Sequence, residues 1–285
     1  MVTVSEFEAV RPRLIATGFR LLGSIHDAED AVQSTWIKAQ ATDTDSLRNP
    51  AAWLTTVLTR VCLDQLRMVR RRREEPVLHL AGLLPAEAVA ADERYLKRED
   101  ISRALMVVLN ALTPDQRVAY VLHDLFDVPF RDIAEVLGTN VNNAKKHASR
   151  ARTRIRQTEI RPAATTVDSA VVDAFIAASA GGDIRRMLDL MTEDCVRVAD
   201  PTLIPRGTPA VVTGSHAVAE ETTLFADRIR ASTPMLVNGH PAYVIAPGGH
   251  HLAVINITIR DGRVAQIEIT RRPVHTESAR PSTTS

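Results

Sequence analysis

The sequence is poor in cysteine. Only Cys62 and Cys195 occur among its 285 residues, and each has apolar neighbours in the chain. Two cysteines are too few for the disulfide framework of a small secreted domain, so we expect buried free thiols in a reducing compartment. The sequence also lacks an apolar run long enough to cross a bilayer, and its first residues follow no signal-peptide pattern. These absences predict a soluble, cytoplasmic protein with no membrane partner.

Acidic residues are missing between Glu135 and Glu159, although the whole chain has a formal charge of only +1. Up to Arg161 there are 24 basic and 21 acidic residues, whereas from Pro162 onwards there are 11 and 13. All four lysines precede Arg161. A basic surface is typical of nucleic-acid binding, so we place that function in the first part of the chain. The remainder is expected to have a different role.

Residues 130–152 read FRDIAEVLGTNVNNAKKHASRAR and predict a helix-turn-helix. Ile133 and Leu137 share one face of the first helix, and Gly138 suits the tight turn because glycine adopts positive φ at low cost. Asn140 is a good N-cap for the second helix. Apolar residues recur along that second helix at steps of three and four, and these are expected to face inwards: Val141, Ala144, Ala148, Ala151 and Ile155.

The other faces of the second helix are rich in amide and cationic side chains. Asn can pair with adenine edges and Lys or Arg with guanine, while further cations suit phosphates. A solvated surface helix is the alternative, since charge runs often mean no more than that. The missing acids and the turn just upstream favour DNA binding. The predicted DNA-binding residues are Asn142, Asn143, Lys145, Lys146 and Arg150.

Three helices are expected in the first 75 residues, over 5–22, 27–39 and 51–73. Ala28, Ala31, Val32, Thr35 and Trp36 form the apolar stripe of the second helix. The third helix has an apolar face as well, with Thr55, Thr56, Thr59, Arg60, Asp64 and Arg67 mostly outside it, and it ends in four arginines, Arg70 to Arg73. These arginines suit either the negative end of the helix dipole or a phosphate backbone.

Several motifs together resemble the extracytoplasmic-function group of bacterial sigma factors. They are D-A-E-D-x-x-Q from Asp27, W-L-x(9)-D-x-L-R from Trp53 with the arginines after it, L-x-P-D-Q-R-x-A-Y-V-L-H from Leu112, and the helix-turn-helix. The resemblance implies core RNA polymerase and promoter DNA as partners, with no catalysis and no cofactor. It implies polymerase binding by Asp27, Glu29, Asp30 and Gln33. It implies −10 recognition by Thr56, Arg60, Asp64, Arg67 and Arg71, capture of a flipped −10 base by the loop 42–49, and −35 recognition by the helix-turn-helix residues named above.

The chain is long enough for two or three domains, each with its own core. Residues 1–75 are expected to form sigma region 2 and residues 99–160 sigma region 4, both all-α. Residues 76–98 and 161–167 are expected to be linkers, because residues 74–91 and 161–167 carry proline and small residues without a sustained period. The helical pattern returns from Asp92. An α+β domain is expected over 168–273, followed by a disordered tail over 274–285.

The α+β prediction follows from the order of the elements. Residues 171–200 predict a helix, a Gly-Gly turn, a second helix and a strand, and residues 218–229 predict one more helix. The period-two alternation afterwards indicates an antiparallel meander. Together with the motif A-x(3)-G-D and the final D-G-R-V hairpin, this order resembles the SnoaL-like cone fold. Enzymes of that fold carry acid/base groups in the pocket, for which the candidates here are Asp200, His216, His240, His250 and His251. Adjacent residues on a strand point to opposite faces, so His250 and His251 do not make a metal pair.

We therefore predict an alternative sigma factor that is not an enzyme and holds no metal, with a third domain that modulates it in cis. A hollow pocket in that third domain would accept a small apolar ligand. Two other classes compete with this interpretation. A ligand-sensing helix-turn-helix regulator would not need the D-A-E-D-x-x-Q motif, and an enzyme with a DNA-binding half would need a coherent acid/base constellation in the third domain.

Overall fold

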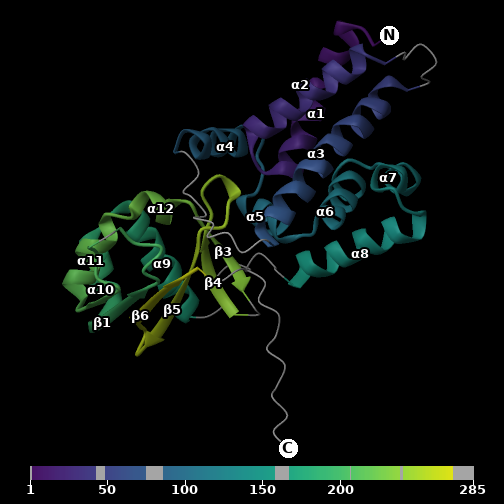
Figure 1. Cartoon of the computed structure of the whole chain (residues 1–285). Coiled ribbons are helices and arrows are strands. Elements are labelled where there is room, and N and C mark those ends of the chain that lie inside the picture. The colour runs from purple at the N-terminus through teal and green to yellow at the C-terminus, as the bar shows by residue number, and fades with distance from the viewer. Residues whose placement is uncertain are drawn as a thin grey trace, which may run out of the picture. The chain divides into compact units, whose positions relative to one another are not determined.

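The computed structural model describes residues 2–42, 49–74, 86–157, 167–205, 207–237 and 240–271. The chain divides into two compact units, Met1–Arg156 and Gln157–Ser285, which we call unit 1 and unit 2 (Figure 1). Among the described residues, no helix combines the length and the apolar character that crossing a bilayer requires. Each unit is described by itself below.

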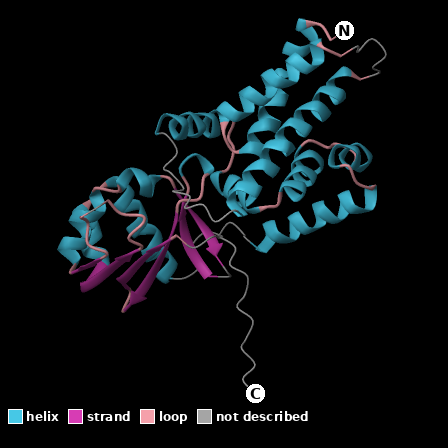
Figure 2. Cartoon of the chain, viewed as in Figure 1, coloured by secondary structure: helices cyan, strands magenta, loops and turns pink. Residues whose placement is uncertain are grey.

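Unit 1 is helical throughout its described part (Figure 2). The starts of its helices follow capping residues in the sequence. Thr3 and Glu6 form a capping box at the first helix, and Thr113 and Gln116 form another, with Pro114 as the first helical residue. The elements are α1 (Val4–Leu22), α2 (Ile25–Gln40), α3 (Pro50–Glu74), α4 (Ala86–Arg98), α5 (Arg103–Ala111), α6 (Pro114–Tyr120), the π-helical turn η1 (Val121–Leu125), α7 (Phe130–Leu137) and α8 (Val141–Gln157).

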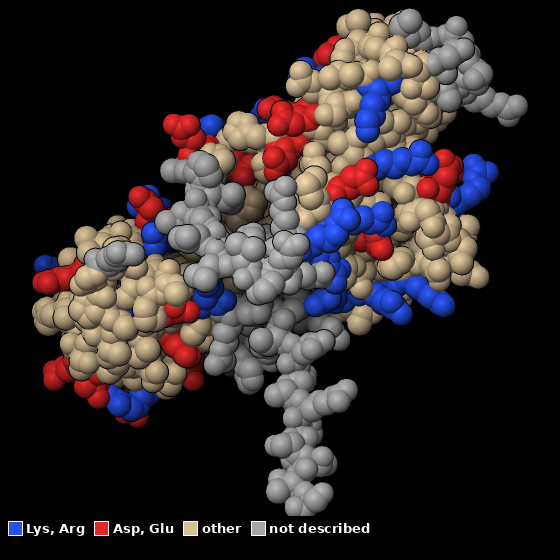
Figure 3. All heavy atoms as spheres, viewed as in Figure 1, with Lys and Arg blue, Asp and Glu red and all other residues tan. Residues whose placement is uncertain are grey.

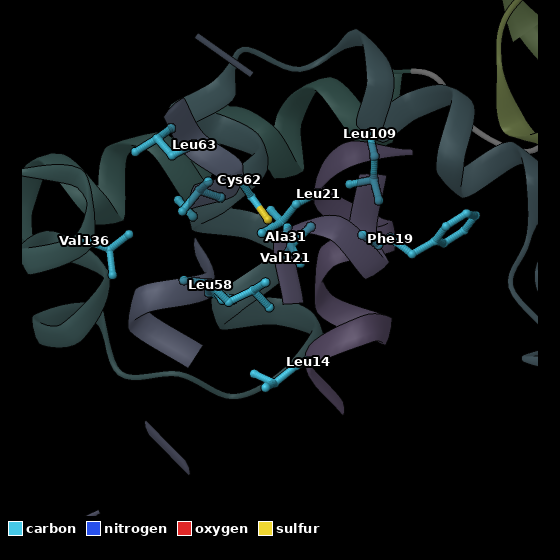
Figure 4. Packing of buried hydrophobic residues seen from close by; sticks show 14 of the residues in the cluster. Leu14, Phe19, Leu21, Ala31, Leu58, Cys62, Leu63, Leu109, Val121 and Val136 are labelled. Carbon is cyan, nitrogen blue, oxygen red and sulfur yellow. The ribbon is translucent and has the colours of Figure 1, made fainter. Parts of the chain in front are cut away.

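One apolar core runs through all of unit 1. Leu14 of α1 and Leu58 of α3 belong to the same buried cluster as Leu109 of α5, Val121 of η1 and Val136 of α7 (Figure 4). The helices of the first segment, 1–75, and of the second, 99–160, thus bury their apolar faces against one another.

Helix α4 lies in the stretch that the sequence analysis assigned to a linker. Tyr95 and Leu96 are buried, and the Tyr95 ring packs on Phe19 with 4.6 Å between ring centroids. The buried Asp92 carboxylate accepts a hydrogen bond of 2.7 Å from the backbone N–H of Ile25 at the start of α2. The alanines of this segment favour a helix, and tertiary packing adds the rest of the stabilisation. The remainder of the predicted linker, 75–85, lies outside the described residues, as do the second linker up to 166 and the predicted tail.

A buried arginine joins α6 to α1. Arg117 is 5% exposed, and its Nη1 donates a hydrogen bond of 2.6 Å to the carbonyl oxygen of Leu21. That carbonyl belongs to the last turn of α1, where backbone acceptors lack partners within the helix. A cation at this end also interacts favourably with the helix dipole. The end of α1 is therefore satisfied by a side chain from far along the sequence.

Both cysteines are buried free thiols, as predicted. Burial raises the pKa of Cys62 to about 12 and that of Cys195 to about 11, because a thiolate is poorly solvated in these surroundings. Neither thiol is ionised near neutral pH, so both are poor nucleophiles there.

Unit 2 is an α+β domain with a six-stranded sheet covered by helices (Figure 2). The order of helices followed by strands agrees with the predicted fold class. Its elements are α9 (Val167–Gly181), α10 (Ile184–Leu190), β1 (Met191–Ala199), β2 (Val211–Thr213), α11 (Ser215–Thr223), α12 (Ala226–Arg230), β3 (Ser232–Val237), β4 (His240–Ile245), the 3-10 turn η2 (Pro247–Gly249), β5 (Ala253–Arg260) and β6 (Arg263–Thr270).

The strand order is β2-β1-β6-β5-β4-β3. Strands β3 to β6 form the predicted antiparallel meander, and the β5–β6 connection uses Asp261 and Gly262 at positive φ, as a two-residue hairpin turn requires. The sheet as a whole is mixed, however, because β1 pairs with β6 in parallel. Period-two alternation identifies a strand but carries no information on the direction of its partner. The single helix expected over 218–229 is interrupted at Leu224 and Phe225, between α11 and α12.

Candidate nucleic-acid interface

Helices α7 and α8 form the predicted helix-turn-helix. Gly138 ends α7 at φ 64°, and the backbone N–H of Thr139 donates a hydrogen bond of 2.9 Å to the carbonyl of Ala134. The Asn140 side chain caps α8 by accepting the N–H of Asn143 at 2.8 Å. The turn residue and the cap are those predicted from the sequence, and each has the expected physical role.

The inward stripe of α8 consists of three alanines. Ala144, Ala148 and Ala151 are fully buried, and Ile155 packs partly against the same core. Val141 was predicted to belong to this stripe but is 38% exposed. It is the first residue of α8 and lies at the end of the stripe, where its neighbours do not bury it. Because alanine side chains are small, α8 packs close to the core, and this packing fixes the orientation of the outer face of α8.

The outer face of α8 carries most of the predicted DNA-binding residues. Asn142, Lys145, Lys146 and Arg150 are exposed, and basic side chains gather along α8 in Figure 3. Asn143 is half-buried, and its Nδ2 donates to Thr139 Oγ1 at 3.1 Å, so this amide is partly engaged within the motif. The motif thus presents a cationic surface on a rigid helix.

Not every cation of α8 faces solvent. Arg152 forms a two-pronged ion pair with Asp124 of η1, with Nε 2.6 Å from Oδ1 and Nη2 3.2 Å from Oδ2. Arg152 therefore differs from the exposed cations Lys145, Lys146 and Arg150 of the same helix. Asp124 neutralises it because the fold brings η1 against α8, which the spacing along the chain does not reveal.

The predicted −10 residues lie along α3. Asp64 and Arg71 are exposed, while Thr56 is half-buried and donates its hydroxyl to the carbonyl of Ala52 at 3.1 Å. Thr59, expected outside the apolar face, is fully buried and bonds to the carbonyl of Thr55 at 2.7 Å. Residues 43–48, most of the loop expected to capture a −10 base, lie outside the described part of the chain.

Two of the predicted −10 residues make ion pairs with the second helical segment. Arg60 Nη2 is 3.0 Å from Glu135 Oε1 of α7, and Arg67 Nη2 is 2.9 Å from Asp115 Oδ1 of α6. All four side chains are more than a third exposed, so each pair contributes only about 0.2–1 kcal/mol. These partners could not be predicted from the sequence, because no local pattern pairs an arginine with a carboxylate that is distant along the chain.

Further contacts join α1 to the end of η1. Arg13 Nη2 donates to the carbonyl of Phe126 at 2.9 Å. The guanidinium groups of Arg13 and Arg20 lie 5.8 and 5.5 Å from the centre of the Phe126 ring, within the range of a cation–π interaction. Contacts from α1 as well as from α3 therefore hold the first three helices of unit 1 against α6, η1 and α7. We call this arrangement the closed form of unit 1.

The predicted polymerase-binding residues form an exposed polar face of α2. Asp27, Glu29, Asp30 and Gln33 are all exposed. The stripe predicted on the opposite side is buried, with Ala28, Ala31, Val32 and Thr35 inaccessible and Trp36 packed partly against the core. Acidic side chains gather where α2 and α4 lie in Figure 3. Ile37, one turn beyond Gln33, is 61% exposed and extends this face with an apolar side chain. Ile37 was not predicted to belong to this face, although its position outside the buried stripe of α2 could have indicated it.

The described acid/base candidates of unit 2 lie on different segments of the chain. Asp200 accepts hydrogen bonds from the N–H and hydroxyl of Thr202 at 2.9 and 2.7 Å, which lowers its pKa, and His216 is exposed at the start of α11. His250 and His251 follow η2 and precede β5, so they are not adjacent strand residues as expected. The side chain of His240 lies outside the described part.

His251 is half-buried between η2 and β5. Burial lowers its pKa, and the positive charge of Arg271 acts in the same direction. Its Nε2 atom is buried without a hydrogen-bond partner among the described residues. No group of three or more potential metal ligands occurs in the part of the chain that the structure describes.

Two family comparisons match the helical unit. Residues 7–73 match the family described as Sigma-70 region 2, and residues 102–155 match that described as Sigma-70, region 4. The first match contains α2 with its polar face and nearly all of α3, and the second contains α5 to α7 and most of α8.

Similar proteins extend over nearly the whole chain. The chain is 38% identical to the ECF RNA polymerase sigma factor SigJ of Mycobacterium tuberculosis, over 93% of this chain and 90% of that protein. It is 27% identical to the probable ECF RNA polymerase sigma factor SigI of the same organism, over 94% and 92%. The crystal structure of M. tuberculosis SigJ aligns over 95% of this chain and 97% of that one, with 34% identity and a TM-score of 0.46. The chain belongs to the extracytoplasmic-function sigma factors, alternative sigma factors that bind core RNA polymerase and promoter DNA and direct transcription initiation.

Proposed function

We propose that this sigma factor binds core polymerase through the polar face of α2, reads the −10 element with α3 and reads the −35 element with α8. The observation that carries the proposal is the outer face of α8. Asn142, Lys145, Lys146 and Arg150 are exposed on a helix whose inner face is fixed by buried alanines. Such a surface can enter a major groove without rearrangement of the helix itself. On α2, acidic side chains and an exposed isoleucine provide charge and apolar area for a protein partner.

The closed form of unit 1 must open before both promoter elements are read. The positions in their names place the −35 and −10 elements about 25 base pairs apart. At about 3.4 Å per base pair, this separation is roughly 85 Å of duplex. In the closed unit, Arg60 of the −10 face is 3.0 Å from Glu135 of the helix-turn-helix. Two reading surfaces in contact cannot meet two such distant elements. Polymerase or promoter DNA therefore has to supply the free energy that separates α3 from α6 and α7.

Unit 2 is proposed to modulate transcription in cis by contact. Residues from Pro162 onwards hold 11 basic and 13 acidic side chains, whereas those up to Arg161 hold 24 and 21. An acidic domain tethered to cationic reading surfaces can compete with DNA phosphates for them or can hold them in a productive arrangement. The proposal assigns unit 2 a role through contact and no catalytic step.

The α2 face can be tested with the double variant Asp30→Ala/Gln33→Ala. We expect loss of binding to core RNA polymerase with an unchanged fold, because both side chains are exposed and outside the buried stripe. A pull-down with purified core polymerase and a far-ultraviolet circular dichroism spectrum measure the two effects. Asp189→Ala/Glu193→Ala removes two exposed acids of unit 2 and serves as the control. Wild-type polymerase binding by the α2 variant would contradict the assignment.

Lys146→Ala and Arg150→Ala test the α8 face in a promoter-binding assay. A residue that contacts a phosphate should lower affinity on every sequence and reduce the salt slope by about one. A residue that reads a base should cost about 1–3 kcal/mol and relax specificity at one position. Arg185→Ala, which removes an exposed arginine of unit 2, should change neither quantity. If both α8 variants bind −35 DNA like the wild type, the helix does not face DNA as proposed.

Opening of unit 1 can be tested with a cross-link between Arg13→Cys and Phe126→Cys. These positions are in contact across the closed unit and are not among the predicted reading residues. Bridging the two thiols with a short bismaleimide should abolish run-off transcription. The same variant capped with N-ethylmaleimide should remain active. Cys62 and Cys195 should not react at neutral pH, since their pKa values are raised to about 12 and about 11. Full activity of the bridged protein would refute the need for opening.

A chain that ends at Arg161 tests the modulating role of unit 2. We expect its run-off transcription with core polymerase to differ from that of the full chain, because the tethered acidic domain is gone. His216→Ala in the full chain is the matched control for loss of chemistry and should leave transcription unchanged. Equal transcription by the truncated and full chains would exclude modulation in cis. Loss of transcription in a folded His216→Ala protein would instead favour a chemical role.

A further inference from the structure

Unit 1 contains a pocket between the last part of α3, the start of α6 and the middle of α8. Its free volume is about 300 Å³, which is at the lower end of the range of about 300–1,000 Å³ usual for small-molecule sites. Roughly ten water molecules fit into such a space, at about 30 Å³ each. The pocket is therefore large enough for a small ligand and lies where three helices meet.

The pocket is lined by several cationic side chains. Arg67 and Arg70 come from α3 and Arg150 comes from α8, and all three are exposed. Basic side chains gather where the end of α3 and α8 lie in Figure 3. Asp115 is the single acid among the described residues that line the pocket. Three positive charges and one negative charge leave a net charge of +2, so the pocket attracts anions.

Asp115 is paired with one of these arginines. Its Oδ1 atom lies 2.9 Å from Nη2 of Arg67, and the two side chains are 37% and 44% exposed. A pair this exposed to water is weak, and a guanidinium group has five N–H donors, of which this contact uses one. Arg67 can therefore donate to a phosphate oxygen while it remains beside Asp115.

The less exposed part of the pocket adds neutral donors. Gln116 Oε1 accepts the backbone N–H of Thr113 at 3.3 Å, so the other terminal atom of this half-buried side chain is Nε2, which can only donate. His147 also lines the pocket, and its Nδ1 atom is buried without a hydrogen-bond partner among the described residues. A ligand that brings an acceptor to this ring would remove the cost of that unpaired atom. Positive charges together with N–H donors suit phosphate oxygens.

The arrangement of the cations favours an anion with more than one phosphate group. Arginine binds phosphate through paired N–H donors in a fixed planar fork, and each phosphate group can engage one such fork fully. Because the guanidinium groups of this pocket come from two different helices, a chain of phosphates can contact more of them than a single phosphate can.

Occupation of the pocket is linked to the closed form of unit 1. Residues of α3 line it together with residues of α6 and α8, so the pocket would be lost when α3 separates from α6 and α7. A ligand that binds only one of two forms shifts the equilibrium towards that form. Arg67 and Arg150 also belong to the proposed reading surfaces, and a bound anion would occupy the groups that DNA needs.

We propose that this pocket binds a free oligophosphate, either inorganic or the phosphate chain of a nucleotide, and that the bound anion holds unit 1 closed and competes with promoter DNA. Binding of the anion follows from the pocket alone. The competition rests on the proposed reading surfaces and on the proposed opening of unit 1, so the two parts are tested separately.

Calorimetric titration of the full chain with sodium tripolyphosphate tests the binding, in magnesium-free buffer at constant ionic strength. We expect one saturable site per chain and about tenfold weaker binding of orthophosphate, because a single phosphate group engages fewer of the cations. Absence of saturable tripolyphosphate binding, or equal binding of the two anions, would overturn the proposal.

Charge reversal locates the bound anion. Arg70→Glu should weaken tripolyphosphate binding about tenfold or more, whereas Arg156→Glu, at an exposed position of α8 outside the pocket, should change it less than about twofold. The two variants change the net charge equally, so a difference between them does not come from total charge. Equal effects of the two reversals would place the anion elsewhere.

Asp115→Asn gives a second test in which binding should become tighter. The variant removes the one acid described in the pocket and releases Arg67, while the apolar core still holds unit 1 closed. Circular dichroism shows which variants are folded, and Asp115→Asn decides the question if Arg70→Glu is not. Unchanged or weaker tripolyphosphate binding by the folded Asp115→Asn protein would contradict the assignment of the pocket.

Competition with DNA is measured with a labelled −35 duplex and the full chain. Saturating tripolyphosphate should lower the affinity of the wild type for the duplex about tenfold more than that of Arg70→Glu, with ionic strength matched by sodium chloride. An equal decrease in both proteins would indicate screening alone and would overturn the competition. If tripolyphosphate does not bind while Arg70→Glu weakens binding to every DNA sequence, the pocket holds a backbone phosphate of DNA and the proposal is wrong. Failure of the −35 assignment with Lys146→Ala would leave the calorimetric result unaffected.

Discussion

The shared apolar core of unit 1 is the constraint on which the rest of its structure depends. Side chains from α1 and α3 are buried in the same cluster as those from α5, η1, α7 and α8. This packing brings the proposed −10 face of α3 against the helix-turn-helix and positions Arg60 beside Glu135. The ion pairs at the edge are weak on their own, so the core, together with the buried Arg117, determines how tightly the unit is closed.

The ion pairs at the edge of this interface and its apolar interior contribute differently to the proposed opening of unit 1. Phosphate groups can replace Glu135 and Asp115 as partners of the arginines at little cost, since the side chains are already in water. The apolar contacts have no such substitute in DNA. Core polymerase, which offers a large protein surface, is the partner better suited to replace them.

Much of unit 1 could be predicted from the sequence because its signals are local. Gly138 and Asn140 define the turn and cap of the helix-turn-helix, and a three- or four-residue period identifies the faces of α2 and α8. The partners of Arg152 and of the α3 arginines could not be predicted, since they are set by packing between distant helices. The first part of helix α4, residues 86–91, was not recognised because it consists mostly of alanine, although Tyr95 and Leu96 anchor the helix in the core. In unit 2 the strands were visible, whereas the parallel pairing of β1 with β6 was not.

The ion pairs of Arg60 and Arg67 have a consequence for how this protein responds to ionic strength. In the proposed binding mode, added salt screens the attraction between α8 and promoter phosphates. It also screens the two carboxylates that pair with the α3 arginines. The first effect would weaken the complex with DNA, and the second would make the proposed open form of unit 1 easier to reach. The measured dependence of promoter affinity on salt will therefore be shallower than the number of phosphate contacts implies. The number of phosphate contacts derived from that slope alone would therefore be lower than the true number.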